Sequence, residues 1–185
     1  IDYNTIGNVP PVGICGSGIL DALAALYRHG VVNVRGRMQD HERVRVGAGE
    51  QREFVLAEAA SSGSGQAIVV TQQDVRELQL AKGAIRTGIE ALLLDAHLHD
   101  EQLDQVIIAG AFGSYIDVTS AIAIGMLPAL PLDRFRQVGN AAGTGARLAL
   151  ISQAQRRLAQ DIGRRIQYIE LAAVPGFQDL FARAM

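Results

Sequence analysis

The sequence has little cysteine, since Cys15 is the one thiol among 185 residues. A single thiol excludes an internal disulfide, and it excludes an iron–sulfur or zinc site built from cysteines of this chain. Scarce cysteine is typical of a reducing compartment, so we expect a cytoplasmic protein. None of the four histidines lies in a recognisable catalytic pattern. We therefore expect Cys15 to be a small buried thiol rather than a nucleophile.

An excess of one charge and long apolar runs are also missing. Lys and Arg number 17 against 19 Asp and Glu, which gives a formal net charge of −2. Without a basic excess, the chain has no electrostatic attraction to nucleic acid or to an anionic membrane. The apolar stretches are too short to cross a bilayer, and no signal peptide is visible. Because Ile1 stands where an initiator methionine would be, we expect a fragment of a longer protein.

The most informative stretch is residues 104–117, DQVIIAGAFGSYID. Residues 106–109 form a short β-branched run, which predicts a strand buried on both faces of a mostly parallel sheet. The run ends at residues 110–113, where glycine leaves bare backbone that a ligand can approach. Ligands of open α/β sheets lie outside the carboxyl ends of the strands. The stretch therefore indicates a ligand site, although a tight turn without a ligand would need the same glycines.

A second glycine-rich segment, residues 13–18, precedes apolar positions at helical spacing that continue to Tyr27. This pattern predicts a helix with Ser17 as N-cap and Gly30 near its C-terminus. Free backbone N–H groups at a helix N-terminus attract anions such as phosphate. The segment matches neither the Walker A pattern nor GxGxxG, so alone it is weak evidence for a phosphate site.

Residues 33–66 differ from the rest in composition. Closely spaced charges from Arg35 to Arg45 indicate a solvated face. Strand candidates at residues 53–58 and 67–71 flank a Ser- and Gly-rich loop. These patterns predict a small two-stranded insertion.

A long helix is expected after this insertion. Thr71 and Asp74 have the spacing of a capping box, with Asp in place of the usual Glu. The apolar positions that follow fall on one face of a helix over residues 75–96. Gln79 and Lys82 lie on a different, polar stripe. Such a stripe usually faces water, but it could face a cleft, where a lysine would meet a ribose or a phosphate.

The last third of the chain has the pattern of short alternating helices and strands. Residues 139–146, GNAAGTGA, predict a helix start packed closely against another backbone. This helix should continue to about Arg165, and its arginine-rich end suits the helix dipole. The other expected elements are a short helix from Asp117 or Thr119 to Ala123, strands over residues 134–138 and 168–171, and a docking helix with Phe177, Leu180 and Phe181.

The glycine- and alanine-rich junctions at residues 13–18, 110–113 and 139–145 each mark a helix start or a strand end. If one sheet carries all three, they converge on one crevice at the carboxyl ends of its strands. Such a crevice favours a ligand with a flat base and a phosphate tail. The spacing alone does not identify that ligand.

Five stretches, taken together and in this order, resemble a known family. They are GICGSGILD, TQQDVRELQLAKGAIRTGI, VIIAGAFGSYID, IGMLP and VGNAAGTGARLALIS. From about Thr5 onward the chain resembles the C-terminal part of the reductive activators of corrinoid proteins. Those activators are iron–sulfur proteins with an ATPase domain of the acetate and sugar kinase, heat-shock chaperone and actin superfamily.

The resemblance implies an α/β fold in which residues 1–185 are the second, ribonuclease-H-like half of an actin-like ATPase domain. A mixed sheet flanked by helices would carry a small α+β insertion over residues 33–100. The nucleotide would lie between the two halves of the domain, and GNAAGTGA would be the connecting helix whose small residues let the halves hinge.

The same resemblance implies a set of nucleotide-binding residues. GAFG matches the adenosine motif of the superfamily, which lies along the base and the ribose. The insertion would cover the adenine. The implied residues are Gly16, Ser17 and Gly18 near the sugar and phosphates, Gly110, Ala111, Phe112 and Gly113 along the base and ribose, Gln79 and Lys82 over the adenine, and Asn140 and Gly143 in the connecting helix.

Other parts of the family pattern are missing from this sequence. The aspartate-bearing glycine loops that hydrolyse ATP, and the domain that binds a [2Fe–2S] cluster through four cysteines, have no counterpart here. Asp21, Asp74, Asp104 and Asp117 fit capping or surface roles, so we assign no catalytic residue and no metal ligand. We expect this chain alone to bind Mg-ATP weakly or not at all, and not to hydrolyse it.

The function implied for the full-length protein is ATP-driven reduction of a Co(II) corrinoid protein to Co(I). An activator of acyl-CoA dehydratases or reductases is an alternative, but its bridging cluster needs cysteines that this domain lacks. A non-catalytic docking module for a corrinoid protein is a second alternative, and a sugar or acyl kinase is a third. The face that a missing half would cover should be apolar, which could also support a homodimer.

Overall fold

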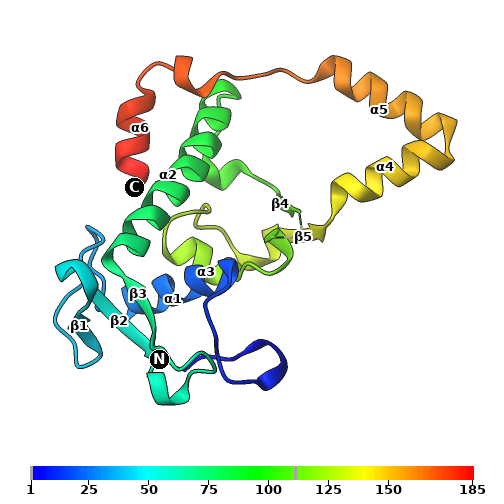
Figure 1. Ribbon diagram of the computed structural model, residues 1–185. Coiled ribbons are helices and arrows are strands. Elements are labelled where there is room, and N and C mark those ends of the chain that lie inside the picture. Colours follow the sequence, from blue (N-terminus) through cyan, green and yellow to red (C-terminus); the bar gives the residue numbers. More distant parts are fainter. Residues whose placement is uncertain (1, 111) are drawn as a thin grey trace.

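The computed structural model describes residues 2–110 and 112–185 (Figure 1). Helices and short strands alternate along the chain, which confirms the α/β class. The helices are α1 (Gly16–Arg28), α2 (Gln72–Asp95), α3 (Val118–Ala123), α4 (Ala141–Ile151), α5 (Gln153–Arg165) and α6 (Phe177–Ala184). The strands are β1 (Val44–Val46), β2 (Arg52–Ala57), β3 (Ile68–Thr71), β4 (Val106–Ala109) and β5 (Phe135–Gly139).

The strands lie in two sheets, one in the expected insertion and one outside it. β1, β2 and β3 form an antiparallel sheet, and β4 pairs with β5 in parallel. The insertion thus has three strands, since β1 joins the two that were predicted. β1 was missed because its alternating arginines resemble a solvated face. Arg45 in fact pairs across the strands with Glu53, with 2.8 Å between Nε and Oε1.

The main core lies where α1, α2, α3 and the three-stranded sheet meet. Phe54 at the centre of β2 faces Val44 and Val70 on the neighbouring strands. Leu26 of α1 and Val75 of α2 are buried in the same cluster. Burial of these apolar side chains from the sheet, α1 and α2 ties the insertion to the rest of the chain and holds α1 and α2 in place.

Side-chain caps set the start of most helices. The capping box of Thr71 and Asp74 at α2 is confirmed, because each side chain bonds the other's backbone N–H. Asp117 caps α3, and Asn140 caps α4. At α1 the expectation was wrong, since Cys15 and not Ser17 is the N-cap.

The exposure of β4 differs from the prediction. Val106 and Ile108 are half-buried, whereas Ile107 is 59% exposed. β4 is parallel to β5, as expected, but it is not buried on both faces. One face of this strand pair remains uncovered by the residues that the structure describes.

The expected continuous helix from residue 141 to residue 165 is two helices. Ser152 has extended backbone angles, ends α4 and caps α5 by accepting a hydrogen bond from the Gln155 N–H. We call α4 and α5 together the arm, which projects from the body of the molecule (Figure 1). The glycines and alanines at residues 141–146 are exposed, so the close backbone packing predicted for this helix start is not found among the described residues.

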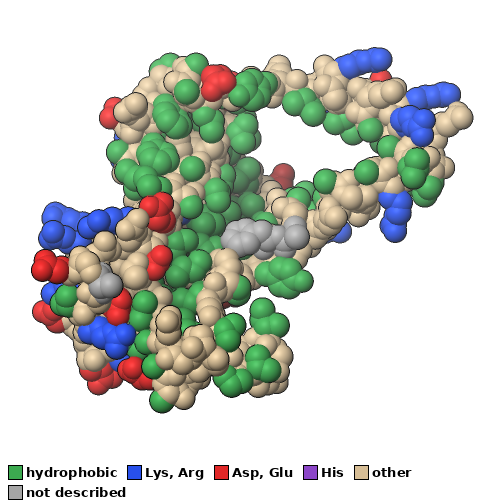
Figure 2. All heavy atoms as spheres, viewed as in Figure 1, with side chains coloured by type: hydrophobic (Ala, Val, Ile, Leu, Met, Phe, Trp, Pro, Cys, Tyr) green, Lys and Arg blue, Asp and Glu red, His purple; other side chains and the backbone are tan. Residues whose placement is uncertain are grey.

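Beyond the arm the chain returns to the body. Residues 168–171 form no strand, and a 3-10 turn at Leu171–Ala173 follows instead. α6 then packs along α2, as predicted for a docking C-terminal helix (Figure 1). Figure 2 shows apolar and arginine side chains at the surface of the arm. Among the described residues, no helix is both long and apolar enough to cross a membrane.

Arg86 of α2 forms a partly buried ion-pair cluster. Its Nε lies 2.9 Å from Glu90 Oε1, and its Nη2 lies 2.7 Å from Asp100 Oδ2. Burial opposes the charge on Arg86, but the hydrogen bonds to Asp100 and Glu90 outweigh burial and raise the pKa of the guanidinium. The cluster therefore fixes the turn after α2 to the helix.

Asp100→Asn should lower the free energy of unfolding by about 1–2 kcal/mol, because it removes the charge that faces a partly buried guanidinium. Asp161→Asn is the matched control. Asp161 pairs with Arg164 at 3.4 Å, and both side chains are well exposed, so no measurable change is expected. Urea unfolding of both variants checks the prediction, and equal midpoints would contradict it.

Candidate functional site

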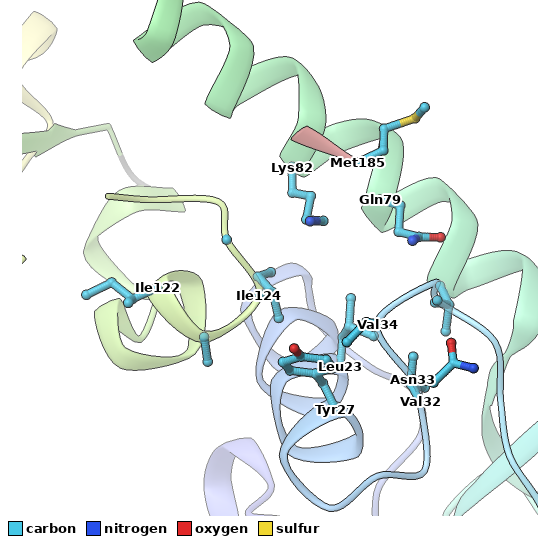
Figure 3. Close-up of a pocket in the computed structure, with 14 residues that line it drawn as sticks. Leu23, Tyr27, Val32, Asn33, Val34, Gln79, Lys82, Ile122, Ile124 and Met185 are labelled. Atoms are coloured by element: carbon cyan, nitrogen blue, oxygen red, sulfur yellow. The ribbon is translucent and has the colours of Figure 1, made fainter. Parts of the chain in front are cut away.

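A cavity of about 240 Å³ lies between α1, α2, the loop after α1 and the turn after α3 (Figure 3). Lys82 and Gln79 extend from α2 toward Tyr27, Leu23 and Val34 on the opposite side. Most of the side chains that line it are apolar, but polar and apolar atoms contribute about equally to the surface of the wall. Apolar side chains with a few polar groups among them are the usual make-up of a small-molecule site. The wall comprises Leu23, Tyr27, Val32, Asn33, Val34, Gly36, Val75, Gln79, Lys82, Ile122, Ala123, Ile124, Gly125 and Met185.

Lys82 is the one lysine of the sequence, and no other described residue of this wall carries a fixed positive charge. Burial lowers the pKa of its amine from the usual value. No described carboxylate pairs with Lys82. A partly buried ammonium without a counter-ion is stabilised by any acceptor that enters the cavity. The cavity is therefore suited to a ligand with hydrogen-bond acceptors or negative charge near Lys82.

The loop over the cavity is fastened to α2 by the Gln72 side chain. Gln72 Nε2 donates to the Gly36 carbonyl at 2.6 Å, and the Met38 N–H donates to Gln72 Oε1 at 2.9 Å. A Cβ at Gly36 would collide with the Gln79 carboxamide, and Gly36 also has a positive φ of 71°. The sequence therefore needs glycine here so that Gln79 can lie beneath the loop.

Two of the three glycine-rich junctions, residues 110–113 and 139–145, lie next to each other. The Gly110 N–H donates to the Gly139 carbonyl at 2.7 Å. Gln137 Nε2 donates to the carbonyls of Gly113 and Ile116, which holds the turn after β4 against β5. Gly110 has a positive φ of 104°, which explains the glycine. Ala111 lies outside the described residues, and so does the side chain of Phe112.

The remaining predicted residues lie elsewhere. Gly16, Ser17 and Gly18 form the first turn of α1, and Gly18 lines a second cavity of about 530 Å³ with the N-terminal segment, β2 and β3. Asn140 Oδ1 accepts a hydrogen bond from the Gly143 N–H at 2.8 Å, so this pair caps α4. The convergence of three junctions on one crevice is thus not found among the described residues, whereas Gln79 and Lys82 share a cavity.

Cys15 also lines the second cavity, and it is exposed, so the buried thiol that we expected is wrong. Its Sγ lies 3.4 Å from Ser17 Oγ and accepts a hydrogen bond from the Gly18 N–H at 3.3 Å. These two hydrogen bonds, led by that of Ser17, lower the pKa of the thiol. Sequence reasoning missed this arrangement because cysteine is not among the usual N-cap residues.

Alkylation of Cys15 by iodoacetamide should therefore reach its half-maximal rate at a lower pH in the folded chain than in urea. The half-maximal rate moves to lower pH because a lowered thiol pKa keeps the reactive thiolate populated as the pH falls. Ser17→Ala should move the folded midpoint back toward the urea value. Identical pH–rate profiles for the folded and the unfolded chain would refute this prediction.

Comparison with known proteins identifies the class first. A family model described as the C-terminal domain of RACo, the ASKHA domain, matches residues 1–185. The α/β fold and this match define an ASKHA domain. Within that class, the chain belongs to the family of RACo C-terminal domains.

Named relatives agree with this assignment. The chain is 40% identical over 190 residues to the corrinoid activation enzyme RamQ of Eubacterium limosum, covering 98% of this chain and 32% of that protein. It is 24% identical over 155 residues to a [Co(II) methylated amine-specific corrinoid protein] reductase of Methanosarcina barkeri, covering 84% and 25%. A solved structure of a reductive activator for corrinoid, iron-sulfur protein matches at 42% identity with a TM-score of 0.88, covering 98% and 29%. The chain thus spans about a third or less of the length of these proteins.

Proposed function

We propose that this chain is the nucleotide-binding part of an ATP-dependent reductive activator, which returns an inactive Co(II) corrinoid protein to Co(I). The observation that carries the proposal is membership of the RACo family along the whole chain. The names of the relatives supply the corrinoid protein as partner. A [2Fe–2S] cluster would belong to other parts of such an activator, since this chain has one cysteine. The expected compartment is the cytoplasm.

The cavity below the 33–36 loop suits one part of a nucleotide. Its volume of about 240 Å³ is below the range of about 300–1,000 Å³ usual for drug-sized ligands, so a base fits better than a whole nucleotide. Lys82 and Gln79 would donate hydrogen bonds to the acceptor edge of adenine. Among the described residues, neither the turn at residues 110–113 nor the first turn of α1 lines this cavity, so the proposed contact with the base depends on Lys82 and Gln79.

ATP can drive reduction of the corrinoid cobalt only if the protein has two conformational states that ATP distinguishes. Reduction of Co(II) to Co(I) in these proteins is uphill, so ATP must favour one conformation over another through different contacts in each. A second half that closes on this one would provide such states by hinge motion. Because the second half would also complete the nucleotide site, we propose that this chain alone binds Mg-ATP weakly or not at all.

A reduction assay tests the proposal. A polypeptide of the length of the relatives, containing these 185 residues, would be mixed with a corrinoid protein, a chemical reductant and Mg-ATP, and the visible spectrum of the corrinoid would report Co(I). The proposal expects Co(I) with ATP and little without it. Equal Co(I) formation with and without ATP would contradict it.

The exposed apolar surface of the arm favours a second candidate function, a docking module. Leu150 and Ile151 are 75% and 73% exposed, and Ile166, which directly follows α5, is 69% exposed. An apolar surface of this kind often marks a protein interface. In this alternative, the 185-residue chain would bind a corrinoid protein without ATP. A second copy of the chain is the competing occupant, and light scattering would separate the two.

A further inference from the structure

The Lys82 amine lies in the cavity without a partner. Its side chain is half-buried and extends from α2 into the space opposite Tyr27 (Figure 3). Among the residues that the structure describes, none forms an ion pair or a hydrogen bond with this amine. Because the side chain is also partly exposed, a molecule that enters the cavity from solvent can reach the nitrogen.

The turn after α3 leaves this amine uncovered. A Cβ at Gly125 would lie 3.7 Å from Lys82 Nζ, and Gly125 has a positive φ of 76°, which favours glycine. The residue beside the amine therefore has no side chain that could cover it or pair with it. The described residues of the wall include no aspartate or glutamate, and Tyr27 is the one other side chain among them that titrates.

An amine in these surroundings is suited to nucleophilic attack. Burial lowers the pKa of the Lys82 amine, so a larger fraction is neutral at a given pH than for a solvated lysine. The neutral amine is the form that attacks a carbonyl carbon, and desolvation is one of the ways in which proteins activate a lysine. The cavity of about 240 Å³ admits a small acyl donor whole, whereas most of a coenzyme thioester would remain outside.

We propose that Lys82 is a site of acylation by small acyl phosphates. In this step Lys82 Nζ forms a bond with the carbonyl carbon, and the bond from that carbon to the phosphate oxygen breaks. Inorganic phosphate leaves with the electron pair, the nitrogen loses a proton to solvent, and no oxidant or reductant is needed. The consequence rests on the proposed function, because an acylated Lys82 would no longer offer its charge to ATP. Acylation would thus regulate the same cavity.

Competition between two amines of one molecule is the first test. Lys82 is the one lysine of the sequence, and Arg76→Lys adds a second lysine on the same helix, at an exposed position outside the described cavity wall. Both amines then meet acetyl phosphate at the same pH and concentration. Mass spectrometry of the digested chain reports the acetylation rate of each.

Near neutral pH, Lys82 should be acetylated at least about threefold faster than the lysine introduced at position 76, because its amine is more often neutral. In urea, which exposes both side chains, the two rates should become equal. A Lys82 rate equal to or below that of the introduced lysine in the folded chain would overturn the proposal.

The consequence for ATP is tested separately. A polypeptide of the length of the relatives and its Lys82→Arg variant, whose guanidinium resists acylation, are titrated with Mg-ATP before and after treatment with acetyl phosphate. Treatment should weaken binding by about tenfold or more where Lys82 is present and leave the variant unchanged. Equal changes in both polypeptides would overturn the regulatory role. The competition test uses no nucleotide, so a failure of the untreated polypeptide to bind ATP would refute the proposed function and not the acylation of Lys82.

Discussion

Phe54→Ala should lower the free energy of unfolding by about 3–5 kcal/mol, because loss of the ring leaves a cavity at the centre of the main core. Phe54 is 1% exposed and joins the three-stranded sheet to α1 and α2. Its ring also lies under the Arg43 guanidinium, with 5.1 Å from Cζ to the ring centroid. That cation–π contact would be lost together with the packing. Since small domains are stable by about 5–15 kcal/mol, much of the fold's stability depends on this ring.

Urea unfolding measures the effect as a lower midpoint with an unchanged slope. Val46→Ala is the matched control, because Val46 lies on β1 of the same sheet but is 70% exposed. Val46→Ala should lower the free energy of unfolding by no more than about 0.5 kcal/mol. A loss below about 1 kcal/mol for Phe54→Ala would mean that the insertion folds without the main core, contrary to the packing described here.

Lys82→Ala should weaken Mg-ATP binding by about 10- to 100-fold in a polypeptide of the length of the relatives. The reason is that Lys82 is the one cation among the described residues of the cavity wall, and burial already lowers the pKa of its amine. A ligand acceptor would supply the hydrogen bond that the free site lacks. The folded chain should not lose stability, since the substitution removes a charge whose burial is unfavourable.

Calorimetry of the variant and of Arg76→Ala checks this prediction. Arg76 lies on the same helix but is exposed and outside the cavity wall, so its removal should leave the affinity unchanged. If Lys82→Ala binds Mg-ATP as tightly as the unmodified polypeptide, the nucleotide does not use this cavity.

Local patterns predicted much of the fold. The capping box at Thr71 and the strand at residues 106–109 were visible because hydrogen bonding and side-chain type within a few residues decide them. β1 escaped prediction because its pairing with β2 depends on residues about ten positions away. Nothing within residues 106–109 indicates that Ile107 lies on an uncovered face, since exposure depends on neighbours from the whole structure.

The candidate site could be predicted only in part. Gln79 and Lys82 were identified as a polar stripe that could face a cleft, and they do line a cavity. Tyr27 and Asn33 were missed, because nothing in the sequence places the end of α1 and its following loop beside the middle of α2. The separation of Gly18 from the 110–113 turn was also not visible, since a glycine-rich pattern shows local backbone freedom and not position in the fold.

An Mg-ATP titration by calorimetry tests whether this chain contributes part of a nucleotide site. It would compare the 185-residue chain with a polypeptide of the length of the relatives that contains it. The longer polypeptide should bind Mg-ATP, whereas the 185-residue chain should bind it weakly or not at all. Absence of binding to both would contradict the claim that this family member contributes to a nucleotide site.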